Sequence, residues 1–305
     1  MTKGSTNRND IEQSKCISVV GLGIMGSAIS RHLIEASYLV VGFDIDARRC
    51  REAEGWGVSI ADDAASSIAA ADLALTSLPS DAALDEVVAD VASRVKNGKP
   101  AVIADLSTLS LACKIRNRDL LSKAGIEFLD CPISGTGAQA KTKDIVIYAS
   151  GDKVKYDGCS AVFSDFSCNS RYLGAFGNGT KTKLIANLLV AIHNVAAAEA
   201  VNLAKRAGLN LDVLCEVIAS GAGGSRVFEL RAPLMAMESY KPPTMKLAVW
   251  QKDMSLIADF AKACGAVTPL FSVTGPLYQA AVDQGRGLED TAAVCAVLQE
   301  MEVQG

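Results

Sequence analysis

Short apolar segments alternate with amphipathic ones through the first half of the chain. Six apolar runs, most of them rich in β-branched residues, predict strands at residues 16–20, 39–43, 73–77, 101–105, 127–131 and 145–149. Segments with helical spacing lie between most of these runs, beginning with residues 24–36. This alternation favours an α/β fold, with a doubly wound, mostly parallel sheet and helices on both of its faces.

The pattern changes after about residue 177. Residues 180–207 contain neither glycine nor proline and are dominated by alanine and leucine, so they predict one long helix that Gly208 is placed to end. Every later apolar segment also has helical spacing. We therefore expect a loose polar tail at 1–14, an α/β domain at 15–176 and an all-α C-terminal domain at 177–305, with the long helix as an interdomain helix.

The long helix is largely apolar and needs cover on several sides. Its longest run without a charge, residues 184–198, is interrupted by Asn187, His193 and Asn194 and is shorter than the roughly 18 to 20 residues of a membrane span. We expect a buried helix and no membrane association. A second subunit would supply part of the cover, which predicts a homo-oligomer, a dimer or a tetramer. The alternative is that the helical domain covers the helix alone.

Composition narrows the possible functions. The chain is 50% hydrophobic, has a formal net charge of −4 and has no long basic stretch, which is typical of a soluble globular protein and argues against a nucleic-acid partner. The nine cysteines are odd in number and form no CxxC pair, so we expect no disulfide framework and no metal site. Together with the lack of a signal-peptide pattern in the first fifteen residues, they predict a cytoplasmic protein.

A glycine-rich turn follows the first predicted strand and opens the first predicted helix. It reads Gly21-Leu22-Gly23-Ile24-Met25-Gly26, the GxGxxG spacing of a dinucleotide-binding turn. The first glycine allows the tight bend, the second lets the backbone approach a pyrophosphate, and the third lets helix and strand pack closely. The helix N-terminus then faces the phosphates. This turn predicts a Rossmann-type cofactor domain.

An acidic residue lies where such a domain needs one. Asp44 stands at the end of the second predicted strand, eighteen residues after Gly26. Its carboxylate would accept hydrogen bonds from both ribose hydroxyls and repel a 2′-phosphate, which favours NAD. Arg48 and Arg49 could reach a 2′-phosphate, so NADP stays open. The alternative interpretation of Asp44 is a helix N-cap.

Two later loops end strands where a cofactor should lie. Leu78-Pro79 follows the third predicted strand of this domain, and Ser107-Thr108 follows the fourth. In doubly wound sheets, ligands gather at the carboxyl ends of the strands. From the residue pattern alone, ordinary turn chemistry explains both loops better.

Four blocks in order make the chain resemble the β-hydroxyacid dehydrogenase family, which includes 3-hydroxyisobutyrate dehydrogenase, tartronate semialdehyde reductase, glyoxylate reductase and L-threonate dehydrogenase. They are the glycine turn at 21–26, Asp-Cys-Pro-Ile-Ser-Gly at 130–135, Gly-Asn-Gly-Thr-Lys-Thr-Lys-Leu-Ile-Ala-Asn at 177–187, and Lys252-Asp253-Met254. The resemblance runs from about residue 16 to the C-terminal helices. It implies oxidation of a short 3-hydroxy acid with NAD.

The resemblance assigns the proton transfer to Lys183. The residue pattern supports this, because Lys183 and Asn187 are four residues apart, share one helix face and open an otherwise apolar helix. A lysine can take the hydroxyl proton only if its pKa is lowered, and desolvation or a nearby cation such as Lys252 would lower it. The alternative is a solvated lysine at a helix start. In reverse, protonated Lys183 would polarise a carbonyl and return the proton.

The same resemblance implies further site residues. Ser134 and Gly135 would grip the substrate carboxylate and hydroxyl, and Asn187 would orient the substrate or Lys183. Thr108 would contact the nicotinamide side, and Lys252 and Asp253 would line the cofactor pocket. Independently of the family, Arg226 could pair with a substrate carboxylate; a surface ion pair explains it equally well.

Departures from the family pattern concern the substrate. Thr136 replaces the second glycine of the Ser-Gly-Gly block, Gln139 and Lys143 replace two later glycines, Ala186 replaces an asparagine, and Met245 replaces an aromatic residue. The stretch 187–200 looks most like members that oxidise L-threonate. Alternatives are an NAD(P)H-dependent reductase of a small aldehyde acid such as glyoxylate or tartronate semialdehyde, and a non-catalytic NAD-binding scaffold. An imine reductase and a 6-phosphogluconate-type enzyme fit less well.

Overall fold

The computed structural model describes residues 15–95 and 102–302. The predicted tail at 1–14 and the first residue of the predicted strand at 101–105 lie outside these ranges. Within them the chain divides into two compact units, the first ending at Thr180 and the second beginning at Lys181. The predicted division after residue 176 falls a few residues earlier. We describe each unit by itself.

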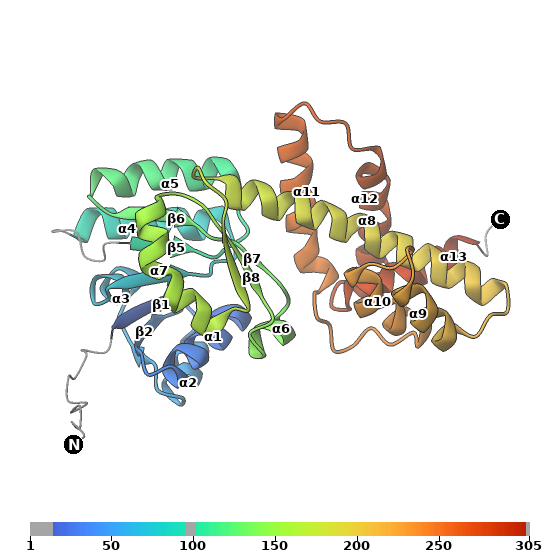
Figure 1. Cartoon of the computed structure of the whole chain (residues 1–305), viewed down its shortest axis with the longest axis horizontal. Helices are drawn as coiled ribbons and strands as arrows, with labels where there is room; N and C mark the ends of the chain where they lie inside the picture. Colours follow the sequence, from blue (N-terminus) through green and yellow to red (C-terminus); the bar gives the residue numbers. More distant parts are fainter. Residues whose placement is uncertain (1–14, 96–101, 303–305) are drawn as a thin grey trace, which may run out of the picture. The chain divides into compact units, whose positions relative to one another are not determined.

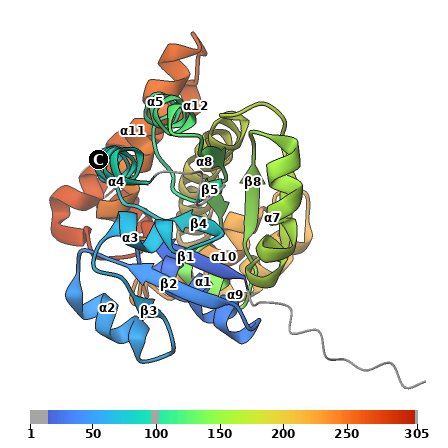
Figure 2. The same cartoon turned by 90° about the vertical axis from the view of Figure 1, so that its left-hand side faces the viewer.

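The first unit is built on a six-stranded sheet of order β3-β2-β1-β4-β5-β6, in which every pairing is parallel. This confirms the doubly wound parallel sheet (Figures 1 and 2). The strands are β1 (Cys16–Val20), β2 (Leu39–Phe43), β3 (Ser59–Ile60), β4 (Leu73–Thr76), β5 (Val102–Asp105) and β6 (Glu127–Asp130). The two-residue strand β3 is too short to appear in the hydrophobic pattern.

Both faces of this sheet are buried under helices. Alternate residues of a strand point to opposite faces, and accordingly Ile17 and Val19 of β1 belong to one apolar cluster while Val20 belongs to another. The helices that cover the sheet and its connections are α1 (Ile24–Glu35), α2 (Ala47–Glu54), α3 (Ala64–Ala69), α4 (Asp81–Arg94), α5 (Leu111–Lys123), α6 (Gly137–Lys141) and α7 (Lys153–Phe166). In Figure 2, α2 and β3 lie on one side of this unit and α7 lies beside β8 on the other.

A second, three-stranded sheet was not predicted. It has the order β7-β8-β9, formed by β7 (Ile133–Ser134), β8 (Val146–Ala149) and β9 (Asn169–Tyr172), with β7 antiparallel and β9 parallel to β8. The predicted strand at 145–149 therefore pairs outside the main sheet. The sequence pattern missed its partners because β7 has two residues and β9 consists of polar residues and one tyrosine.

The second unit is all-helical, as predicted. Its helices are α8 (Asn178–Arg206), α9 (Leu211–Ser220), α10 (Arg226–Ala236), α11 (Leu247–Ala263), α12 (Pro269–Ala281) and α13 (Val294–Glu302), with short turns η1 (Val282–Arg286) and η2 (Thr291–Ala293). Helix α8 supplies Leu184, Ala191, Val195, Ala198 and Val201 to its core. Gly208 follows the end of α8 with a φ of +72°, the left-handed conformation expected of a C-terminal glycine.

Among the described helices, α8 alone is long and apolar enough to cross a membrane by length and composition. Its buried polar residues show how it is held in the helical unit. The Asn194 side-chain amide donates hydrogen bonds of 2.9 Å to the Tyr278 hydroxyl and to the Thr291 carbonyl. The Asn202 amide donates to the Cys295 carbonyl at 3.3 Å. Such bonds to neighbouring helices are typical of the core helix of a globular domain.

Candidate active site

The glycine turn has the geometry that a dinucleotide requires. Gly21 has a φ of +92°, and a Cβ there would lie 2.2 Å from the Ser77 carbonyl oxygen; a Cβ at Gly26 would lie 1.8 Å from the Gly21 carbonyl oxygen. Both positions therefore exclude side chains. A Cβ at Gly23 would meet nothing closer than an Arg49 nitrogen at 3.6 Å. The backbone at Gly23, the N-cap of α1, is thus open to a phosphate group.

Asp44 lies beside this turn because β1 and β2 are parallel neighbours with Val20 opposite Phe43. The buried Asp44 carboxylate accepts hydrogen bonds of 2.8 Å from the backbone N–H groups of Leu22 and Asp46. The N-cap of α2 is Asp46 rather than Asp44. The N-cap alternative for Asp44 is therefore wrong, and the residue holds the glycine turn against the end of β2.

Arg49 adds a feature that the sequence only suggested. Its guanidinium lies 3.3 Å from Asp44 Oδ2, and its side chain is 45% exposed. A carboxylate offers about four acceptor positions, and the two backbone groups with Arg49 use three of them. A ribose with two free hydroxyls needs two acceptor positions on Asp44, and these are open only when Arg49 turns away. A 2′-phosphate would instead lie close to the Arg49 guanidinium. The residues of this turn fit either nicotinamide dinucleotide.

The ends of β4 and β5 meet through Ser107, which the sequence pattern placed only in a loop. The Leu78 backbone N–H donates to Ser107 Oγ at 2.8 Å, so the predicted cofactor loop is held by the neighbouring strand end. Pro79 is exposed, and Thr108 is half-buried beyond Ser107. The structure thus brings Leu78 and Ser107 together at the carboxyl edge of the sheet.

The loop after β7 carries the predicted substrate residues and the main departures from the family pattern. Ser134 is half-buried, and Gly135 has a φ of +144°, with a Cβ position only 2.6 Å from Ile145 Cγ2. Thr136 and Gln139 form a capping box at the start of α6, in which Gln139 Oε1 accepts the Thr136 N–H at 3.0 Å. Lys143 keeps a φ of +61° where the family pattern has glycine.

In the helical unit, α8 and α11 bring four predicted residues together. Asn187 donates its side-chain amide to Asp253 Oδ2 at 2.9 Å, and Lys252 Nζ lies 3.6 Å from Asp253 Oδ1. Lys183 is buried one helical turn before Asn187. Burial lowers the pKa of Lys183 to about 8; the Asp253 carboxylate opposes this lowering and the Lys252 ammonium adds to it. A buried lysine that titrates near neutral pH can accept or donate a proton.

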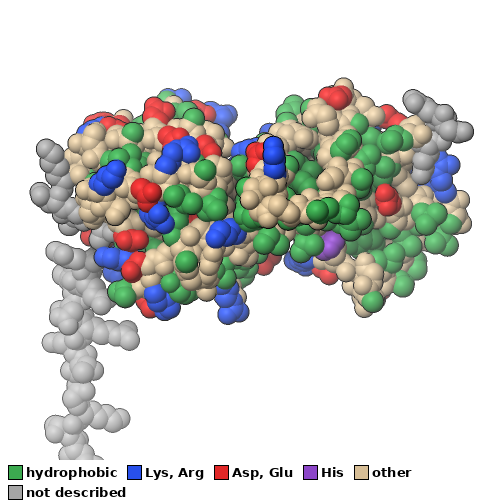
Figure 3. Space-filling view, turned by 90° about the horizontal axis from the view of Figure 1, so that it is seen from above, with side chains coloured by type: hydrophobic (Ala, Val, Ile, Leu, Met, Phe, Trp, Pro, Cys, Tyr) green, Lys and Arg blue, Asp and Glu red, His purple; other side chains and the backbone are tan. Residues whose placement is uncertain are grey.

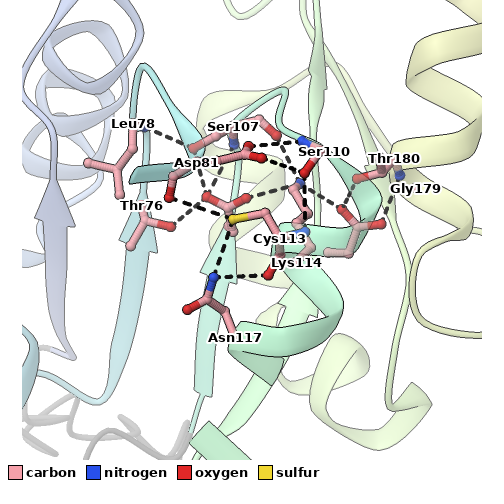
Figure 4. Close-up of polar contacts among 12 residues, drawn as sticks. Thr76, Leu78, Asp81, Ser107, Ser110, Cys113, Lys114, Asn117, Gly179 and Thr180 are labelled. Carbon is pink, nitrogen blue, oxygen red and sulfur yellow. Dashed lines mark hydrogen bonds and ion pairs between the residues drawn. The ribbon is translucent and has the colours of Figure 1, made fainter. Parts of the chain in front are cut away.

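A buried ionic cluster in the first unit was missed by sequence reasoning (Figure 4). Lys114 of α5 is fully buried, and its Nζ lies 2.9 Å from Asp105 Oδ2 and 2.7 Å from Asp130 Oδ1. Burial alone would lower the pKa of Lys114, but the two carboxylates outweigh it and raise that pKa. The position of Asp130 at the head of a recognised block was the only available signal, because nothing in the spacing of α5 marks Lys114.

Comparisons with known proteins agree with this geometry. Residues 16–174 match the model of the NAD binding domain of 6-phosphogluconate dehydrogenase, and residues 177–298 match that of the NAD-binding domain of NADP-dependent 3-hydroxyisobutyrate dehydrogenase. L-threonate dehydrogenase of Escherichia coli (strain K12) is 30% identical over 296 residues, which are 95% of this chain and 96% of that protein. The chain belongs to the 3-hydroxyisobutyrate dehydrogenase-like β-hydroxyacid dehydrogenase family.

Other relatives show how widely this family varies. Glyoxylate/succinic semialdehyde reductase 2 of Arabidopsis thaliana is 31% identical over 92% of this chain and 79% of its own length. The solved structure of Mycobacterium tuberculosis 3-hydroxyisobutyrate dehydrogenase with L-serine has a TM-score of 0.85 and 28% identity, covering 94% of this chain and 99% of that one. The present chain is thus an NAD(P)-dependent 3-hydroxyacid dehydrogenase that acts on a CH–OH group.

The structure gives Arg226 and Cys131 of this β-hydroxyacid dehydrogenase ordinary structural explanations. Arg226 is exposed in the first turn of α10 and forms an ion pair of 3.0 Å with Glu229, as expected of a surface pair. Cys131, beside the substrate loop, is fully buried, and burial raises the pKa of its thiol well above the usual value, as expected of a packing residue. Among residues 15–95 and 102–302, no group of three or more His, Cys, Asp or Glu side chains could hold a metal ion.

Proposed function

We propose that this enzyme oxidises a short 3-hydroxy acid of the L-threonate type, with NAD as the hydride acceptor and Lys183 as the general acid/base. The observation that carries the proposal is the buried Lys183 with its pKa lowered to about 8. L-threonate dehydrogenases among the relatives of this chain support the substrate class. The Asp44 carboxylate, which would repel a 2′-phosphate, supports NAD as the preferred cofactor.

Each side chain then has a definite task. A bound oxidised nicotinamide supplies the hydride acceptor. Neutral Lys183 takes the proton of the substrate hydroxyl, and Asn187, fixed by Asp253, holds the hydroxyl or the lysine in line. Ser134 and the backbone after it bind the carboxylate. In the opposite direction, protonated Lys183 polarises the carbonyl and returns the proton.

The test is turnover of a panel of acids by wild-type enzyme and Lys183→Met. L-threonate, 3-hydroxyisobutyrate, D-glycerate and 4-hydroxybutyrate would each be mixed with NAD while the absorbance of the NADH formed is recorded. We expect one acid to give NADH, Lys183→Met to lose that signal with NAD binding retained, and the matched control Lys181→Met to keep it. Turnover by Lys183→Met equal to wild type would refute the mechanism; a loss of NAD binding as well would point to a folding defect.

A reductase of a small aldehyde acid is the second candidate, favoured by the Arabidopsis relative and by Arg49 beside the ribose site. Glyoxylate and succinic semialdehyde with NADPH, at equal concentrations, would test it. A higher kcat/KM for either aldehyde with NADPH than for any hydroxy acid with NAD would replace the first proposal. If Lys183→Met and wild type alike bind NAD and no member of either panel reacts, either the altered loop around Thr136 and Gln139 accepts another acid or the chain binds NAD for a purpose other than this chemistry.

We also propose a cytoplasmic homo-oligomer. Hydrophobic side chains cover much of the face of the helical unit in Figure 3, whereas charged ones are scattered over the other unit. Helix α9 contributes no buried residue, and Leu209, Val213 and Val217 are each more than half exposed. A second copy would bury these three apolar side chains. Light scattering after size exclusion should give a dimer or tetramer that Val213→Glu weakens; a wild-type monomer at micromolar concentration would refute the proposal.

None of the nine cysteines forms a disulfide, which supports a reducing compartment.

A further inference from the structure

The buried cluster around Lys114 connects three strand ends. Lys114 Nζ donates hydrogen bonds to the Ser107 carbonyl at 2.8 Å and to Asp130 Oδ1 at 2.7 Å, and it forms an ion pair of 2.9 Å with Asp105 Oδ2. Asp105 Oδ1 in turn accepts the hydroxyls of Thr76 and Ser107, each at 2.7 Å. The carboxyl ends of β4, β5 and β6 are thereby tied to one ammonium group.

The far side of this cluster holds the start of helix α8. Asp130 Oδ2 accepts the Thr180 backbone N–H at 2.8 Å, and Asp130 Oδ1 accepts the Thr180 hydroxyl at 2.7 Å (Figure 4). The Gly179 N–H donates to Ser150 Oγ at 2.9 Å, and Ser150 Oγ donates to Asp130 Oδ2 at 3.1 Å. Two of the backbone donors that every helix leaves unpaired at its N-terminus are thus satisfied from the strand ends.

The contact is close and charged. A Cβ at Gly179 would lie 2.2 Å from the Tyr148 carbonyl oxygen and 2.7 Å from the Asp130 carbonyl oxygen, so only glycine lets the helix begin here. A carboxylate at a helix N-terminus also interacts favourably with the helix dipole. Lys114 and Thr180 supply two donors to Asp130 Oδ1, and both are essentially inaccessible to solvent. The Asp130 side chain is therefore held by donors on each side.

Lys183 follows Thr180 by three residues on the same continuous helix, and residues three apart share one helix face. We infer that Asp130, held in place by Lys114, is a positioning residue for the reaction. It fixes the first turn of α8 and so positions Lys183, which the same helix carries. The inference rests on the proposed role of Lys183. Misplacing a reacting group by about 1 Å costs on the order of 100-fold in rate.

The test removes one hydroxyl and leaves the charges in place. Thr180→Val keeps the shape of the buried side chain and its backbone N–H but loses the bond to Asp130 Oδ1. We expect kcat to fall roughly 10- to 100-fold with KM for NAD unchanged, because the glycine turn and Asp44 are untouched. Thr180→Ser should restore kcat. Thr274→Val, which deletes another buried hydroxyl in α12, is the matched control and should keep it.

Two further measurements separate positioning from instability. First, kcat is expressed per equivalent of bound NADH, so unfolded protein does not count. Second, amide hydrogen exchange should become faster at residues 179–184 in Thr180→Val and not in Thr274→Val. An unchanged kcat in Thr180→Val, or an equal fall in Thr274→Val, would overturn the inference. If Lys183→Met itself retains turnover, the proposed function fails, while the exchange data still decide whether Asp130 caps α8.

Discussion

Two charged neighbours pull the pKa of Lys183 in opposite directions, so its titration can be moved either way by one substitution. Burial lowers the pKa from 10.5 to about 8, the Asp253 carboxylate raises it and the Lys252 ammonium lowers it. Lys252→Met should therefore raise the pKa of Lys183. Asp253→Asn should lower it, and the amide that this substitution introduces still offers an oxygen to the Asn187 side chain.

The magnitude matters at physiological pH. With a pKa of 10.5, about 0.03% of lysine side chains are neutral at pH 7, whereas a pKa of about 8 makes about 10% neutral, a gain of roughly 300-fold. Oxidation needs the neutral form, so the rate of oxidation should rise with pH and level off above the pKa of Lys183. Because Lys252 is 38% exposed, water screens its charge. We expect each substitution to move the midpoint by about half to one pH unit.

The assay is kcat/KM for the hydroxy acid at saturating NAD between about pH 6 and pH 10.5, which reports the ionisation of the enzyme before the acid binds. Lys262→Met removes the same charge near the end of α11 and should leave the midpoint where it is. Midpoints that stay unchanged in both variants, or that move in the same direction, would refute the electrostatic account of Lys183.

Three further results follow from the geometry. The pKa of Lys183 is lower in the folded state than in the unfolded state, so its charge destabilises the fold below about pH 8, and this penalty disappears as the pH rises toward 10.5. In urea unfolding at pH 7, Lys183→Met should therefore have a free energy of unfolding higher than wild type by about 1–3 kcal/mol. An unchanged free energy of unfolding would contradict the cost of burying the charge. Arg49→Gln should weaken NADPH binding about tenfold or more relative to NADH in calorimetric titrations, and equal losses would show that Arg49 plays no part in recognising the phosphate. Lys143→Gly should relieve the left-handed conformation at φ +61° and raise stability by about 0.5–1 kcal/mol; a lower melting temperature would mean that Lys143 makes compensating contacts.

The proximity of the glycine turn and Asp44 could be predicted because both lie close together in the sequence. A strand, a GxGxxG turn and a helix lie within about twenty residues, and Asp44 comes at the end of the next strand, so spacing alone gives their proximity. The shared helix face of Lys183 and Asn187 could be predicted equally well, because polar residues four apart are unusual on an apolar helix. Their partner Asp253 was reached only through the family block.

The Lys114 cluster could not be predicted, for a physical reason. Asp105 and Asp130 each end a strand, and Lys114 lies in the helix between them, so the three meet only after β5 and β6 pair. A lysine in an amphipathic helix is normally solvated, and no periodicity distinguishes one that is fully buried. The second sheet could not be predicted for a similar reason, because its stability comes from strand pairing and not from the composition of β7 and β9.

The departures from the family pattern concentrate in one structural unit after β7. Gln139 Oε1 accepts a hydrogen bond from the Thr136 backbone N–H. This N–H therefore belongs to the cap of α6 and does not bind a substrate carboxylate. Gln139 Nε2 donates to Asp144 Oδ2 at 3.0 Å, which ties the cap to the turn that contains Lys143. Thr136 and Gln139 are thus linked to each other and, through Asp144, to the turn that contains Lys143. A substitution set of this kind can alter which acid is bound while the residues proposed for cofactor binding and proton transfer stay the same.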